Sequence, residues 1–119
     1  MYRVKTLNKI STLGLDQLNK DRFQVGADVE NEDGNLVRSA PMQDYVFPSA
    51  LRAIARAGAG TNNIPIDRCS ENGIVVFNTP GANANAVKEL VIAALLIASR
   101  DIIGGSRWVT EQSADPGID

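Results

Sequence analysis

Two stretches decide the fold of this chain: RAGAGTNN at residues 56–63 and IVVFNTPG at residues 74–81. The first stretch ends an apolar strand in an arginine and a glycine bend, and the second is an apolar strand followed by a turn. Between them, Ile66–Asn72 reads as a short helix that ends at Gly73, because glycine accepts the left-handed conformation. The unbroken apolar run Ile74–Phe77 is typical of a strand that is covered on both faces.

The rest of the chain continues this alternation, which favours a parallel α/β sheet flanked by helices. We expect a helix over Ser11–Leu18, capped by Ser11 and with its leucines turned inward, and four more strands over Tyr2–Leu7, Phe23–Val25, Asn35–Ser39 and Ala53–Ala57. A last helix, capped by Asn83 or Asn85, should run to about Ile103 and break at Gly104-Gly105. The sequence thus predicts one domain over residues 1–103 and a polar linker over residues 104–119.

Composition narrows the possible functions. The chain has 119 residues, a net charge of −2 and no histidine. Nucleic-acid binding needs a basic face, and the net charge of −2 argues against it. Without histidine, the chain can have neither a histidine base nor a histidine metal ligand. Cys69, the only cysteine, is expected to be a buried thiol, and a chain without a disulfide suits the cytoplasm. The apolar run Leu90–Ala98 is too short to cross a bilayer, and we expect neither a membrane nor a metal as partner.

The last helix is apolar nearly all round, whereas a helix on a single sheet face needs an apolar stripe of only about 100°. Its apolar residues are Ala86, Val87, Leu90, Val91, Ala94, Leu95, Ile97, Ala98 and Ile102. The surplus predicts a partner surface, either a second copy of the chain or another domain. The alternative is a helix that is wholly internal.

Arg38 and Arg56 each follow an apolar strand segment, LV and AIA respectively. Ligands of open parallel sheets bind at the carboxyl ends of the strands. Both guanidinium groups are therefore expected along the side of the sheet that these strand ends form, which is called the carboxyl edge below. The bend at Ala59-Gly60 would add backbone N–H groups that suit carboxylate or phosphate oxygens. These features predict a site for a doubly anionic small molecule. Alternatively, both arginines are solvated or pair with acidic residues, namely Asp28, Asp44 or Glu71.

The glycines at 58 and 60 do not make a dinucleotide-binding fingerprint. Asn63 stands where the third glycine would be, and Pro65 interrupts the helix that should follow at once. The turn at Asn78-Thr79-Pro80 also follows a predicted strand, so it belongs to the same carboxyl edge. Asn78 is expected to orient the neighbouring loop through hydrogen bonds from its side chain to the backbone.

In these motifs the chain resembles the D-isomer-specific 2-hydroxyacid dehydrogenases, and within them the branch of D-3-phosphoglycerate dehydrogenases. The resemblance covers about residues 1–105 and rests on LVRS at 36–39, RAGAGTNNI at 56–64, GIVVFNTP at 73–80 and VKEL at 87–90. Many members have aspartate at the positions of Asn62 and Pro65. The resemblance implies a flavodoxin-like substrate-binding domain of an NAD-dependent enzyme that oxidises 3-phospho-D-glycerate in serine biosynthesis.

The resemblance also implies roles for individual residues. Arg38, Ser39, Arg56 and the amides of Ala59 and Gly60 would bind the substrate, while Ala59, Asn78, Thr79 and Pro80 would lie near the nicotinamide of NAD. The last helix, about residues 85–103, would form a homodimer. The family's NAD-binding domain and its catalytic Arg, Glu and His have no counterpart in these residues, so the chain is expected to be inactive alone.

Two other classes of function remain open from the sequence. The first is a non-catalytic α/β domain that binds a small anion or a protein. The second is a phosphorylation receiver domain, which has this size and alternation. A receiver needs an acidic pair after the first strand and an aspartate after the third, whereas this chain has Asn8 and Arg38 there. The sequence therefore disfavours a receiver.

Overall fold

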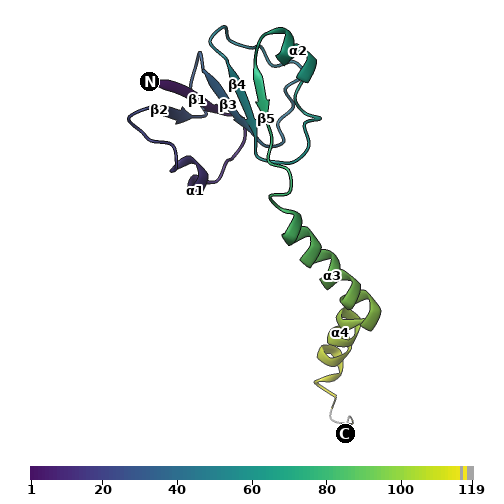
Figure 1. Cartoon of the computed structure of the whole chain (residues 1–119). Coiled ribbons are helices and arrows are strands. Elements are labelled where there is room, and N and C mark those ends of the chain that lie inside the picture. The colour runs from purple at the N-terminus through teal and green to yellow at the C-terminus, as the bar shows by residue number, and fades with distance from the viewer. Residues whose placement is uncertain (116, 118–119) are drawn as a thin grey trace. The chain divides into compact units, whose positions relative to one another are not determined.

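The computed structural model describes residues 1–115 and residue 117. The chain divides into two compact units, residues 1–82 and residues 83–119, which are described separately (Figure 1). The described part of the first unit forms a five-stranded parallel sheet in the order β2-β1-β3-β4-β5. The strands are β1 (Tyr2–Thr6), β2 (Phe23–Gly26), β3 (Gly34–Val37), β4 (Ala53–Arg56) and β5 (Val75–Phe77). The predicted parallel α/β fold is confirmed.

Strand β3 ends earlier than the sequence suggests. We expected it to reach Ser39, but it stops at Val37, and Arg38 and Ser39 follow it. The reason is a competing acceptor, because the N–H groups of Arg38, Ser39 and Ala40 all donate to the side-chain oxygen of Asn8. The two arginines nevertheless stay neighbours, since Val37 pairs with Arg56 in the sheet.

The helix after β1 is much shorter than predicted. Helix α1 covers only Thr12–Leu15, and the Ser11 hydroxyl makes no capping hydrogen bond. Leu13 is 80% exposed, so the expectation that it points inward is wrong, whereas Leu15 and Leu18 are half-buried. Gly14 in the middle of so short a segment weakens the helix.

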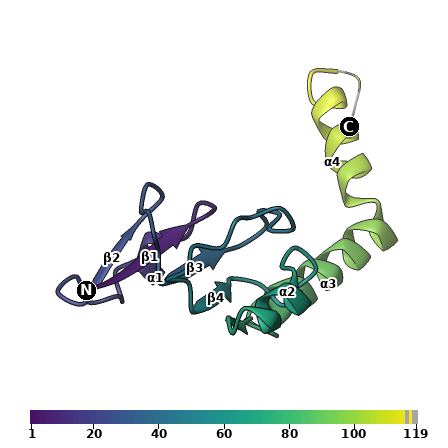
Figure 2. The same ribbon diagram turned by 90° about the horizontal axis from the view of Figure 1, so that it is seen from above.

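The core of the first unit lies on one face of the sheet. Val37 and Ile54 project from β3 and β4 into a cluster completed by Met42, Leu51, Ile64, Cys69 and Ile74. Helix α2 (Ile66–Glu71) supplies Cys69, which is buried as predicted. Gly73 follows α2 with a φ of +67°, the predicted left-handed position. Figure 2 shows strands β1, β2, β3 and β4 from a second direction.

Strand β5 differs from its prediction of cover on both faces. Val75 and Phe77 are 54% and 58% exposed, and only Val76, which points the other way, packs against the core. Within the described residues, the apolar run of β5 is therefore packed against the core on one face only.

The second unit consists of helix α3 (Ala84–Arg100) and helix α4 (Ile102–Gln112). Asn83 takes the N-cap position of α3, although its side chain makes no capping bond. The predicted break at Gly104-Gly105 is wrong, because the turn falls at Asp101, which is left-handed at φ 44°. The Asp101 side chain then accepts the N–H of Gly104 at 3.2 Å, and a Cβ at Gly104 would collide with that carboxylate. Gly104 thus belongs to the first turn of α4, and residues 104–112 of the predicted linker are helical.

Most large apolar side chains of α3 and α4 are exposed, among them Leu90 at 70%, Leu95 at 65% and Trp108 at 57%. Across the described residues, no helix has both the length and the apolar character that crossing a membrane requires.

Candidate anion-binding site

The carboxyl ends of β1, β3, β4 and β5 bring four chain segments to one edge of the sheet (Figure 1). Asn8 follows β1, Arg38 follows β3, Arg56 ends β4 and Asn78 follows β5. Because all strands are parallel, these residues share the edge at which open α/β sheets bind ligands. The sequence interpretation placed three of the four here, and Asn8 is an addition.

Asn8 connects the first and third strands at this edge. Its Oδ1 accepts the N–H groups of Arg38, Ser39 and Ala40 at 3.0, 3.0 and 2.9 Å. These contacts fix the backbone from which the Arg38 side chain projects. A short polar residue immediately after a strand was the available signal, but its meaning depends on β1 lying beside β3.

The Arg56 side chain is held from two directions. Its Nε donates to the Arg38 carbonyl at 2.9 Å, and its Nη1 donates to Oδ1 of Asn62 at 3.1 Å. The bend lies close against this guanidinium, since a Cβ at Gly58 or Gly60 would stand 3.3 or 3.1 Å from an Arg56 nitrogen. Both glycines therefore permit the approach of the charge to the bend. Neither acceptor is an anion, so the positive charge is oriented but not neutralised.

The bend itself is tied down by its carbonyl groups. The Thr79 N–H donates to the Gly58 carbonyl at 2.9 Å, and Nδ2 of Asn78 donates to the Ala59 carbonyl at 2.7 Å. The predicted role of Asn78 in orienting this loop is confirmed. The N–H groups of Ala59 and Gly60 have no acceptor within residues 1–115 and 117. The bend therefore has two N–H donors without an acceptor among the described residues, while the Gly58 and Ala59 carbonyls are occupied.

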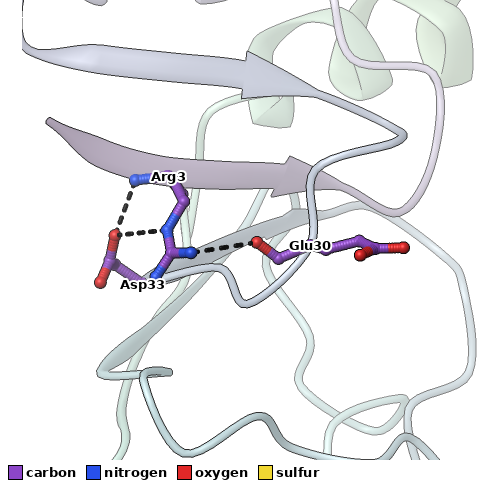
Figure 3. Close-up of polar contacts among 3 residues, drawn as sticks. All are labelled: Arg3, Glu30 and Asp33. Atoms are coloured by element: carbon purple, nitrogen blue, oxygen red, sulfur yellow. Dashed lines mark hydrogen bonds and ion pairs between the residues drawn. The ribbon is translucent and has the colours of Figure 1, made fainter.

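Among residues 1–115 and 117, neither arginine is paired with a carboxylate. The ion pair found in the described part of the chain joins Arg3 Nε to Asp33 Oδ2 at 3.7 Å, and it lies at the opposite, amino-end edge (Figure 3). The alternative in which Arg38 or Arg56 pairs with Asp28, Asp44 or Glu71 is therefore wrong. Two unneutralised guanidinium groups on adjacent strand ends favour binding of an anion.

The other residues predicted to bind substrate or cofactor are exposed. Arg38 is exposed and lines an open hollow with Lys9, Ile10, Ser11 and Thr12. Ser39 contributes its backbone N–H to Asn8, and its side chain is exposed. Pro80 is exposed beyond the turn, while the Thr79 hydroxyl donates to the Arg56 carbonyl at 3.5 Å. Binding of a substrate or a cofactor by these residues stays a prediction.

The groups with shifted pKa values lie elsewhere. Burial, followed by the hydrogen bond to Glu32, raises the pKa of Tyr45 to about 12. Burial also raises the pKa of the Cys69 thiol. The Tyr45 hydroxyl bonds Glu32, which precedes β3, and Cys69 lies in the core, so neither group belongs to the carboxyl edge.

Comparison with known proteins identifies relatives for almost the whole chain. The family described as "D-isomer specific 2-hydroxyacid dehydrogenase, catalytic domain" matches residues 4–116. D-3-phosphoglycerate dehydrogenase of Mycobacterium leprae is 39% identical over 85 residues, which is 69% of this chain and 16% of that protein. The enzyme of the same name from Bacillus subtilis is 33% identical over 114 residues, 86% of this chain and 22% of the relative.

A third relative carries a different name. Hydroxypyruvate reductase of Thermotoga maritima is 48% identical over 52 residues, 44% of this chain and 17% of that protein. The chain spans less than a quarter of the length of each of these curated relatives.

Proposed function

Because the chain belongs to the D-isomer specific 2-hydroxyacid dehydrogenase family, we propose that its first unit holds a small 2-hydroxy acid for oxidation by NAD. The substrate we propose is 3-phospho-D-glycerate, with 3-phosphohydroxypyruvate as product, in cytoplasmic serine biosynthesis. The proposal for this substrate is supported by relatives named D-3-phosphoglycerate dehydrogenase and by the two arginines at one edge. The name hydroxypyruvate reductase among the relatives makes a smaller acid the competing substrate.

One observation carries the proposal: Arg56 is fixed beside a bend in which the N–H groups of Ala59 and Gly60 have no acceptor among the described residues. A carboxylate at this bend would accept the N–H groups of Ala59 and Gly60 and face the Arg56 charge. Each charge-assisted hydrogen bond contributes about 1.5–3 kcal/mol. The contribution of these residues to the reaction is to bind and orient the acid, because positioning alone lowers the barrier of a two-reactant step.

The residues near the bend fit a nicotinamide in part. Asn78 uses its Nδ2 on the Ala59 carbonyl, which leaves its Oδ1 free to accept a hydrogen bond from a carboxamide. The exposed Thr79 and Pro80 would border the ring. When bound, NAD supplies the hydride acceptor at its nicotinamide ring. The 119 residues contain no histidine and no Gly-x-Gly-x-x-Gly sequence, so we propose that they bind substrate but turn over none by themselves.

We also propose that α3 forms the interface of a homodimer. Its exposed apolar side chains, including Leu90, Val91 and Leu95, would each contribute about 1.5–3 kcal/mol if buried against a second copy. Sedimentation velocity of the chain and of Leu90→Asp tests this. We expect a dimer that the substitution dissociates, and a wild-type chain that stays monomeric at high concentration would refute the interface.

Calorimetric titration of the 119-residue chain with 3-phospho-D-glycerate tests the main proposal. We expect saturable binding that weakens about tenfold or more in Arg56→Ala, because one charge-assisted contact is lost. Arg22→Ala is the matched control, since it removes an exposed positive charge at the amino end of β2. Equal affinity of wild type and Arg56→Ala would remove Arg56 from the site. NADH formed by the chain with NAD and this acid would refute the proposed lack of turnover.

A further inference from the structure

One face of the sheet in the first unit holds no buried strand residue. Strand residues alternate between the two faces, and Val37, Ile54 and Val76 point to the core. Their neighbours in sequence point the other way and pair across the sheet in two rows, namely Val4, Gly34, Ala53 and Val75, and then Thr6, Leu36, Ala55 and Phe77. We call these two rows the open face. Each of its residues is half-buried or exposed, and none is charged.

An open face is unusual for a parallel sheet, because helices cover both faces of nearly all parallel sheets. It also contains a hollow of about 320 Å³, which is lined by Tyr2, Val4, Phe23, Asp33, Gly34, Arg52 and Ala53. Gly34 and Ala53 have little or no side chain, so they leave room for apolar groups from outside the first unit. An uncharged, hollowed apolar face of this kind is typical of a docking surface.

We propose that helix α3 of a second copy covers the open face. The inference rests on the homodimer proposed above and names the surface of the partner that α3 contacts. A helix is the element that normally covers a parallel sheet. Helix α3 has exposed apolar side chains that require a partner, and the open face requires a helix.

The charge distribution and length of α3 fit this position. Residues 90–99 of α3 carry no charge and are about 15 Å long at the usual rise per residue. The five-residue strand β1 is about 17 Å long. Charged residues stand only at the ends of α3, with Lys88 and Glu89 before the uncharged stretch and Arg100 after it. The helix can therefore lie along the strands without removing a charge from water.

The distribution of apolar residues on α3 favours a second copy as the partner. Residues four apart share one side of a helix, so Val87, Val91 and Leu95 form one stripe, and Ile92 and Leu96 form another. All five are exposed. One stripe can pack on the partner's open face and the other on the partner's α3. Each copy has one open face and one such helix, so the exchange is reciprocal and closes a two-fold dimer.

Cross-linking between two different chains tests the contact directly. Chains with Val75→Cys and with Leu95→Cys, the latter carrying a size tag, are mixed and treated with a short bismaleimide. We expect a covalent heterodimer of the two variants, which can arise only between copies. Val46→Cys in place of Val75→Cys is the matched control, because Val46 is an exposed valine outside the open face and should not cross-link to Leu95→Cys. The native Cys69 is buried and should not react.

Sedimentation velocity tests the energetic contribution of the open face. For Val75→Asp we expect the dissociation constant of the dimer to rise about tenfold or more, the effect of losing one large apolar contact. Val46→Asp should leave that constant unchanged. Val75 is 54% exposed within the chain, so the variant should fold. If urea unfolding shows that Val75→Asp is destabilised, the cross-link with the milder Val75→Cys still decides.

The outcomes separate this inference from the proposed dimer. If Leu90→Asp dissociates the dimer but Val75→Asp does not, the α3 interface stands and the open face is not part of it. Cross-links of Leu95→Cys to itself alone, with none to Val75→Cys, lead to the same conclusion. A wild-type chain that stays monomeric at high concentration would overturn the dimer and this inference together.

Discussion

The two edges of the sheet in the first unit differ in whether, among the described residues, their arginines are paired with a carboxylate. At the amino-end edge, Asp33 accepts the Arg3 N–H at 2.7 Å and pairs with the Arg3 guanidinium, which also donates to the Glu30 carbonyl (Figure 3). At the carboxyl-end edge, the guanidinium of Arg56 touches only uncharged acceptors, and Arg38 touches none among the described residues.

This difference separates stability from recognition. Polar groups that are already hydrogen-bonded within the chain are not available to a ligand, and their removal lowers the free energy of unfolding. Positive charge that is oriented but not neutralised adds little to folding and is available to an anion. Substitutions at the amino-end edge should therefore lower stability and leave anion affinity unchanged, and loss of an arginine at the other edge should do the reverse.

The largest loss of stability is expected for Tyr45→Phe near the amino-end edge. The Tyr45 hydroxyl donates to Glu32, which is only 2% exposed, so the substitution leaves a buried carboxylate without its donor. We expect a loss of about 1.5–3 kcal/mol in urea unfolding at neutral pH. Unchanged affinity for 3-phospho-D-glycerate is the companion result, and a large loss of affinity would contradict the separation of the two edges.

The same tyrosine should make the free energy of unfolding depend on pH in the alkaline range. Burial and Glu32 raise its pKa to about 12 in the folded chain, above the usual value of about 10 in the unfolded chain. Folding therefore favours the protonated phenol, and this stabilisation is complete below pH 10 and lost as the pH rises to about 12. The difference in unfolding free energy between wild type and Tyr45→Phe should shrink over that window. A difference that is constant from pH 8 to 12 would show that the phenol has no raised pKa.

A smaller loss of stability is expected for Asp33→Ala. The substitution removes the acceptor of the half-buried Arg3 N–H and an exposed ion pair, which together contribute about 1–2 kcal/mol. Asp33→Asn keeps an oxygen in place and should recover most of the loss. Urea unfolding measures both variants, and an equal loss in the two would assign the effect to charge instead of the hydrogen bond.

At the carboxyl-end edge, Asn8→Ala should affect both properties moderately. Three backbone N–H groups lose their common acceptor, but two of them belong to exposed residues that water can reach, so we expect about 1 kcal/mol of destabilisation. Freed from Asn8, Arg38 should be less ordered, and affinity for the phosphorylated acid should fall severalfold. Asn8→Asp retains the acceptor oxygens and serves as the control for stability.

The smallest change in stability is expected for Asn62→Ala, with a clear effect on binding. The substitution removes one exposed acceptor of Arg56, which contributes roughly 0.5 kcal/mol to folding. The guanidinium then keeps only the Arg38 carbonyl as an orienting partner, and we expect a severalfold loss of affinity. Unchanged affinity in calorimetry would show that Asn62 does not orient Arg56 for binding.

The sequence predicted those features that depend on local pattern. Apolar runs located the five strands, and the arginines that follow two of them were assigned to the correct edge, because parallel strands fix which ends meet. Gly73 was predicted from the conformational freedom of glycine, and Asn78 from its place after a strand. Each of these inferences needed only a few neighbouring residues.

Features that depend on the three-dimensional placement of particular side chains escaped prediction. Asn8 lies 30 residues before Arg38 and meets its N–H only because β1 and β3 are adjacent. Asn62 was noted only as a departure from a family pattern, although it is an acceptor of Arg56. The helix break was placed at glycines because glycine weakens helices, whereas the left-handed Asp101 and its own carboxylate set the boundary.

The most direct test of the contrast between the edges is an amide NMR titration of the 119-residue chain with 3-phospho-D-glycerate. We predict saturable shifts of the amides in residues 38–40 and 58–61, with those of Arg3 and Asp33 unmoved. Shifts centred on Arg3 and Asp33, or no saturable shift in residues 58–61, would contradict the assignment of anion binding to the carboxyl-end edge.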